Sequence, residues 1–198
     1  GEPQDPLHMP LPGRPVPVLT AALGGQGGGV MADWLMEAAT ASGYPARATS
    51  IPGVAQRTGA TTYYLEIFPA QKKDLGGKEP VLSLTPSPGN VDVMVASELI
   101  EVGRAMLNGF VSPERTTLIA STHRIYATVE KMQMADGRFE SERVVAAAAQ
   151  LARQSVLFDM RKLAQESGTV INAVLFGAMA GSGVLPLSRE SCEQAIRH

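Results

Sequence analysis

Residues 16–29 read VPVLTAALGGQGGG, and this stretch decides the fold class of the 198-residue chain. Residues 16–23 are apolar enough for a buried strand, and residues 30–42 repeat apolar side chains at helical spacing after a turn made almost entirely of glycine. Glycine lets a ligand approach the backbone, and the start of a helix presents unpaired N–H groups. The stretch therefore predicts an α/β fold and a ligand- or partner-contacting loop made by Gly24, Gly25, Gln26, Gly27 and Gly28.

The composition excludes several classes of protein. A net charge of −2 gives no overall attraction for nucleic acid or anionic membranes. No apolar run approaches the roughly 20 residues of a membrane-spanning helix, and the N-terminal residues lack the apolar segment of a signal peptide. Cys192 is the single cysteine, so the chain can hold neither an internal disulfide nor a cysteine-ligated cluster. We expect a cytoplasmic protein with a proline-rich tail or linker at 1–15 and one domain at 16–198.

Strand and helix patterns alternate along that domain, which predicts a doubly wound, mostly parallel sheet with helices on both faces, a Rossmann-like three-layer α/β fold. Predicted strands cover residues 16–23, 46–51, 61–68, 91–96, 116–120 and 156–158. Predicted helices cover residues 30–42, 98–107, 141–154, 161–166, 170–180 and 188–197. The sequence also suggests a short strand at 81–84, a hairpin arm at 125–129 and a turn at Asp136-Gly137.

The glycine loop matches the dinucleotide fingerprint only in part. Gly27, Gly29 and Ala32 have the spacing of G-x-G-x-x-[GA]. A complete fingerprint adds an acidic residue about 20 positions later, to hold the ribose hydroxyls. No Asp or Glu occurs between Glu37 and Glu66, and no lysine follows the glycines as in a Walker loop. A nucleotide-binding oxidoreductase and a regulatory ligand-binding module stay open as alternatives.

Residues for independent catalysis are sparse. His8, His123 and His198 are far apart in sequence, and no pair has the spacing of metal ligands. His123 follows a predicted strand, where functional residues often lie, but a single loop histidine is more often structural. The sequence therefore predicts no catalytic residue and no metal site on this chain.

A second segment, PGVAQRTGATT at residues 52–62, points to a family. Together with residues 24–27 it resembles the gamma domain of the 2-oxoacid:ferredoxin oxidoreductases, where a G-x-G-G-Q-G loop is followed by a Met-Ala-Gln-Arg-Gly-Gly-like segment. Within this family the chain is most similar to the beta-subunit type that acts on indolepyruvate. Departures from the pattern are Ala21-Ala22-Leu23 and Thr58-Gly59. Further matches, which extend the resemblance over residues 16–197, lie at 92–98, 172–178, 185–187 and 190–196.

The resemblance implies a component of an enzyme that converts an aryl 2-oxoacid and CoA to acyl-CoA and CO2 and reduces ferredoxin. Thiamine diphosphate, Mg²⁺ and the iron–sulfur clusters would then belong to a large partner subunit, through which ferredoxin is reached. This chain has one cysteine, and its nearest string to a thiamine Gly-Asp-Gly motif is Ala135-Asp136-Gly137. It would bind no cofactor itself, and a homodimer is left open. Beside the glycine loop, the residues expected to contact a ligand or the partner are Gln56, Arg57 and Gly59.

Overall fold

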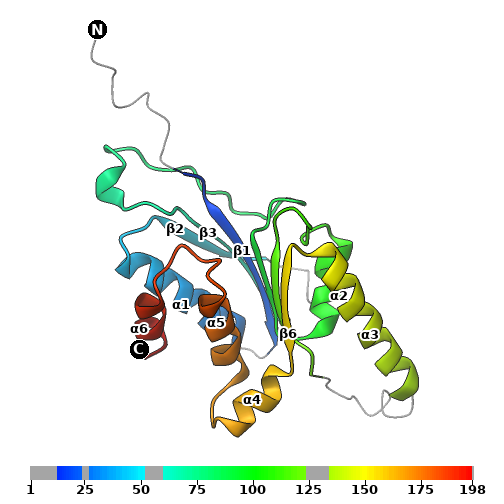
Figure 1. Cartoon of the computed structure of the whole chain (residues 1–198). Coiled ribbons are helices and arrows are strands. Elements are labelled where there is room, and N and C mark those ends of the chain that lie inside the picture. The colour runs from blue at the N-terminus through cyan, green and yellow to red at the C-terminus, as the bar shows by residue number, and fades with distance from the viewer. Residues whose placement is uncertain (1–12, 24–26, 52–59, 124–133, 198) are drawn as a thin grey trace.

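A computed structural model describes residues 13–23, 27–51, 60–123 and 134–197 of the chain. They form a six-stranded sheet with the strand order β2-β3-β1-β4-β5-β6 (Figure 1). The strands are β1 (Val16–Leu23), β2 (Ala46–Ser50), β3 (Ala60–Ile67), β4 (Val93–Ala96), β5 (Thr117–Ser121) and β6 (Gln154–Phe158). The helices are α1 (Gly27–Ala41), α2 (Leu99–Leu107), α3 (Met134–Leu151), α4 (Met160–Glu166), α5 (Ile171–Gly181) and α6 (Arg189–Arg197), with a short 3₁₀ turn, η2 (Lys72–Asp74).

Helices cover both faces of the sheet, as the sequence predicts (Figure 1). One core lies between the sheet and α1, α4, α5 and α6, and it includes Leu35, Phe176 and the buried Cys192. The other lies between the sheet and α2 and α3, where Val102 and Ala148 are fully buried. The predicted three-layer architecture is therefore confirmed, and nearly every predicted strand and helix lies within a few residues of its observed bounds.

One strand, β3, runs antiparallel to both of its neighbours, β1 and β2. The other strands are parallel to one another, so the sheet is mostly parallel. A parallel connection needs a crossover of about a dozen residues or more. The link between β2 and β3 spans only residues 51–59, which is too short for a crossover helix. The chain therefore turns back at the edge where β2 ends.

Two predictions about local structure are wrong. Asp136-Gly137 is not a turn but lies inside the 18-residue helix α3, which outweighs the cost of about 1 kcal/mol for an internal glycine. Residues 81–84 are not a strand, because their backbone bonds to side chains: the Ser83 N–H donates to Glu66 Oε2 and the Leu84 carbonyl accepts from Thr49 Oγ1. The predicted hairpin arm at 125–129 lies outside the described residues.

Candidate ligand and partner site

The parallel strands end at one edge of the sheet, and ligand sites of open α/β sheets form beyond such an edge. Several polar residues gather there. The Ser97 N–H, just after β4, donates to the Ala21 carbonyl over 2.9 Å. His123 follows β5, and Asp159 follows β6 as the N-cap of α4. The described part of this edge therefore carries a polar residue after each of three neighbouring strands, with Ser97 buried and Asp159 exposed.

The two segments singled out in the sequence leave from this same edge. Leu23 and Ala60, which flank them, are paired in the β1–β3 ladder. Gly27 and Gly28 form the first turn of α1. The other predicted site residues, Gly24, Gly25, Gln26, Gln56, Arg57 and Gly59, lie outside the described residues. Their role as contacting residues stays a prediction, supported by the common edge of the residues that flank them.

The packing also explains one glycine of the loop. A Cβ atom at Gly29 would lie 3.3 Å from Tyr63 Oη, which is tighter than nearly all real contacts of this kind. Glycine at this position lets the first turn of α1 approach β3 closely. The glycine run thus has a packing role at residue 29 that is separate from any ligand role.

His123 is held by a small hydrogen-bond cluster at the end of β5. Its Nδ1 lies 2.7 Å from Ser121 Oγ, and that hydroxyl oxygen also accepts from the Met160 N–H over 3.0 Å. The Ser121 hydroxyl proton is then available to donate to a neutral imidazole. Burial first, and the nearby Arg161 guanidinium second, lower the pKa of His123, while Asp159 opposes them. The site thus favours an uncharged histidine.

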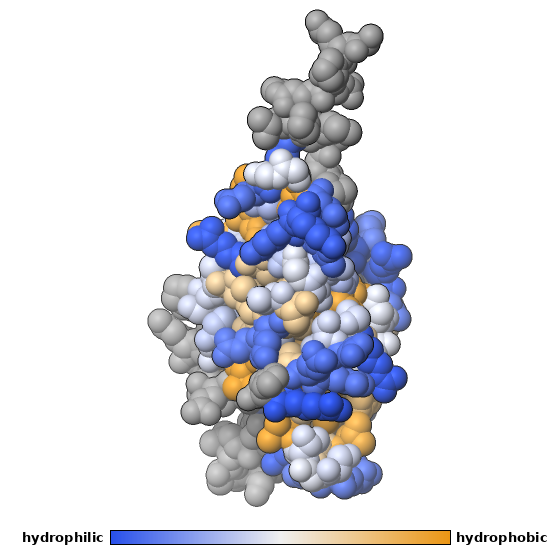
Figure 2. Space-filling view, turned by 90° about the vertical axis from the view of Figure 1, so that its left-hand side faces the viewer, coloured by the Kyte–Doolittle hydropathy of each residue, from blue (hydrophilic) through white to orange (hydrophobic). Residues whose placement is uncertain are grey.

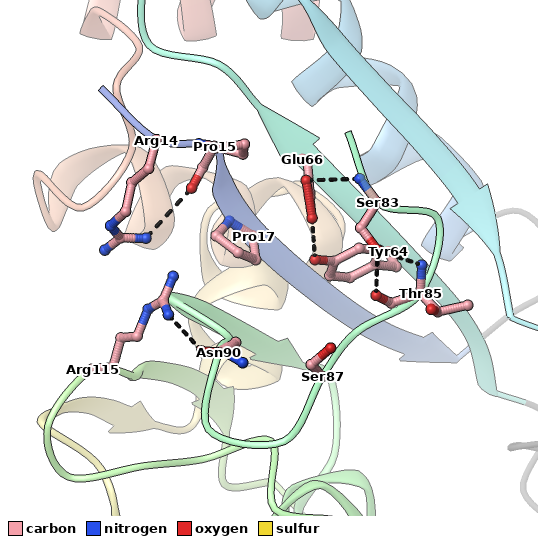
Figure 3. Close-up of a pocket in the computed structure, with 10 residues that line it drawn as sticks. All are labelled: Arg14, Pro15, Pro17, Tyr64, Glu66, Ser83, Thr85, Ser87, Asn90 and Arg115. Carbon is pink, nitrogen blue, oxygen red and sulfur yellow. Dashed lines mark hydrogen bonds between the residues drawn. The ribbon is translucent and has the colours of Figure 1, made fainter. Parts of the chain in front are cut away.

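A polar pocket of about 200 Å³ lies at the opposite edge of the sheet (Figure 3). On its floor the Tyr64 hydroxyl donates to Glu66 Oε1 over 2.8 Å, and the Ser83 N–H donates to Oε2 over 3.0 Å. Both Tyr64 and Glu66 are buried. Burial, with the hydrogen bond to Glu66, raises the pKa of Tyr64 above its usual range. Each oxygen of the carboxylate accepts one hydrogen bond, and the bond from Ser83 fastens the chain around that residue to β3.

Asp92 organises the rim of this pocket. It accepts from Arg115 Nε over 2.7 Å and from Arg14 Nη1 over 2.9 Å. Arg115 also donates to Asn90 Oδ1 (Figure 3). The sequence analysis did not predict this pocket. Its floor could have been found in part, because Thr62, Tyr64 and Glu66 are alternate residues of β3 and so share one face of the sheet. The two guanidinium groups share the Asp92 carboxylate, and the Glu66 carboxylate also lines the pocket, so the pocket offers a ligand little net charge.

A second hollow, of about 400 Å³, lies beside the start of β2. Its lining includes Arg47, Lys72 and Lys78 together with Glu79. Hydrophilic residues are prominent on this side of the molecule (Figure 2). The hollow is open and mixed in charge, and it lies away from the edge where the strands β1, β4, β5 and β6 end.

Within the described residues, no group of three or more His, Cys, Asp or Glu side chains could hold a metal ion. The helices of that part of the chain also include none long and apolar enough to cross a membrane.

Comparisons with known proteins agree with this architecture. The chain is 27% identical over 183 residues to the indolepyruvate oxidoreductase subunit IorB of Thermococcus kodakarensis, covering 91% of this chain and 84% of that protein. It is 28% identical over 190 residues to IorB of Pyrococcus horikoshii, with the same coverage of 91% and 84%. The gamma subunit of the keto/oxoacid ferredoxin oxidoreductase of Geobacter sulfurreducens has a similar fold, with a TM-score of 0.57 and 18% identity over 93% of this chain and 84% of that chain.

The family comparison covers nearly all of the described residues. The model of the pyruvate ferredoxin/flavodoxin oxidoreductase family matches residues 17–198, which include both the glycine loop and the Gln56-Arg57 segment. The resemblance inferred from those two motifs is confirmed: this chain belongs to the pyruvate ferredoxin/flavodoxin oxidoreductase family.

Proposed function

We propose that this chain is a subunit of an indolepyruvate:ferredoxin oxidoreductase, and that it is the subunit that binds neither thiamine diphosphate nor iron–sulfur clusters. Together with a large subunit that carries thiamine diphosphate, Mg²⁺ and iron–sulfur clusters, it would convert an aryl 2-oxoacid and CoA to acyl-CoA and CO2 and reduce ferredoxin. The observation that carries the proposal is the likeness to IorB over 91% of this chain and 84% of that subunit. A single cysteine supports the assignment of the clusters to the partner.

The role of this chain would be to complete the assembly and to contribute one wall of the active site or of the CoA path. Two described features support the carboxyl edge of the sheet for that contact. The residues that flank both motifs, Leu23 and Ala60, are paired there. The polar residues His123 and Asp159 follow the neighbouring strands at the same edge.

Co-expression with the cognate large subunit tests the function. The purified chain alone should be colourless and inactive with indolepyruvate, CoA and an electron acceptor, and the pair should show CoA-dependent reduction of ferredoxin. Pyruvate and 2-oxoglutarate serve as comparison substrates, because they lack the aryl group. Turnover by the lone chain, or a bound flavin, would favour a self-sufficient oxidoreductase; a pair that prefers pyruvate would overturn the aryl substrate.

A further inference from the structure

Strand β6 forms one free edge of the sheet. It pairs only with β5 and lies at the front of the sheet in Figure 1, with no described segment across it. The Phe158 carbonyl accepts from the Thr122 N–H, and the Gln154 N–H faces the Thr116 carbonyl, so the backbone of these residues points toward β5. Because backbone groups alternate along a strand, the N–H and C=O groups of Ser155 and Leu157 point outward.

This edge lacks the usual protection against pairing with another chain. Such edges are commonly blunted by charged side chains or proline. The opposite edge strand, β2, has both, with Pro45 just before it and the exposed Arg47 within it. Strand β6 reads Gln-Ser-Val-Leu-Phe, with no charge and no proline. Phe158 is 38% exposed, and Leu151 and Leu163, in the helices that join β6, are 43% and 42% exposed. These features are typical of a strand that is covered by a partner.

We propose that the occupant of this edge is β6 of a second copy, paired antiparallel about a two-fold axis at Val156. In this register Ser155 and Leu157 of opposite copies exchange both backbone hydrogen bonds, and the two Val156 residues face each other without a hydrogen bond. The outward backbone groups identified above are the ones that this pairing uses. The proposal concerns the assembly of this chain and does not depend on the proposed reaction.

The charges on either side of β6 select both the second copy and the register. Arg153 and Asp159 lie at the same sequence separation on either side of Val156. Arg153 of one copy would therefore lie opposite Asp159 of the other copy. Both are exposed, and Arg153 takes part in no ion pair among the described residues. Asp159 Oδ1 accepts from the Lys162 N–H, which leaves its second oxygen for a guanidinium. A shift by two residues in either direction would break both ion pairs.

The pairing would join two six-stranded sheets into one continuous sheet. Because the two β6 strands run in opposite directions, the two carboxyl edges would face opposite ends of the dimer.

A charge-complementation experiment on the full chain tests the interface. The wild-type chain should sediment at twice the mass of one copy. Arg153→Asp should place two aspartates together, and Asp159→Lys should place a lysine against arginine, so each variant alone should dimerise at least about tenfold more weakly. An equimolar mixture should recover the dimer, because mixed pairs have opposite charges at both positions. Lys73→Asp, an exposed charge reversal outside β6, is the matched control and should remain dimeric.

Disulfide trapping provides a second test that is independent of charge. Val156→Cys should form a cross-linked dimer on oxidation, because facing residues of a non-hydrogen-bonded pair bring their Cβ atoms within disulfide range. Ser155→Cys should not, since its opposite residue is Leu157. The native Cys192 is buried and should not interfere. A monomeric wild type, dimeric single charge variants, a mixture that stays monomeric, or equal cross-linking at both positions would overturn the proposal.

Discussion

His123 shows how a local environment sets the protonation of one residue. Its folded-state pKa is lowered below the usual 6.5, mainly by burial. As the pH falls, the unfolded chain therefore binds a proton before the folded chain does, and the free energy of unfolding decreases. We expect lower stability at about pH 5.5 than at about pH 7.5, with a smaller difference in His123→Gln. Urea unfolding at both pH values measures this, and an equal pH dependence in the variant would contradict it.

Tyr64 is the residue whose hydroxyl supports the buried carboxylate of Glu66. Tyr64→Phe would leave Glu66 Oε1 without its 2.8 Å donor in a buried site. We expect a loss of about 1–3 kcal/mol in the free energy of unfolding. Tyr63→Phe is the matched control, because Tyr63 is on the opposite face of the same strand and its hydroxyl makes no hydrogen bond within the described residues. Equal losses in the two variants, measured by urea unfolding, would argue against a special role for the Tyr64–Glu66 bond.

At the scale of elements, α1 and α5 meet through aromatic side chains. Trp34 and Phe176 pack edge to face, with ring centroids 5.3 Å apart. Phe176 is fully buried, so Phe176→Ala should lower stability by about 3–5 kcal/mol. Trp34 is the only tryptophan, so its emission should also change in the folded variant. Leu107→Ala, at a position that is 88% exposed, should change neither quantity. A Phe176→Ala loss below about 1 kcal/mol would contradict this packing.

The sequence predicts most elements because their patterns are local. The apolar run at 16–23, the glycines and the helical spacing after them are sufficient for β1 and α1. The direction of β3 is not a local property, since it depends on the length of the link from β2 and on which strands become neighbours. Asp136-Gly137 fails for a related reason, because a favourable long helix overrides a local turn preference.

At the scale of the whole molecule, the site is expected to work only in an assembly. If Arg57 holds the phosphate of CoA or a carboxylate of the large subunit, Arg57→Ala should cost about 1.5–3 kcal/mol of binding, or roughly ten- to hundredfold in affinity. The melting temperature of the lone chain should hardly change. Arg47→Ala is the matched control, because Arg47 is an exposed arginine in β2. Subunit affinity and the apparent affinity for CoA are the measurements, and an unchanged complex or an unfolded variant would assign Arg57 a structural role.

The candidate site could be predicted from the sequence only in outline. Two motifs predicted its position, and the pairing of Leu23 with Ala60 is consistent with a common edge. The Tyr64–Glu66–Ser83 network could not be predicted in full, because Ser83 is 17 residues away from Glu66 and meets it only in the folded chain. The Ser121–His123–Met160 cluster likewise depends on how β5 and α4 are brought together.

Because of its position, Cys192 can report on local unfolding of the native chain. The Cys192 thiol is buried in α6 against α1. Burial also raises the pKa of the thiol, so a thiol reagent in solvent has little access to the sulfur and little thiolate to react with. Labelling must then wait for α6 to detach transiently. The rate of thiol modification therefore measures how often α6 separates locally from the folded domain. Melting experiments report only the unfolding of the entire domain.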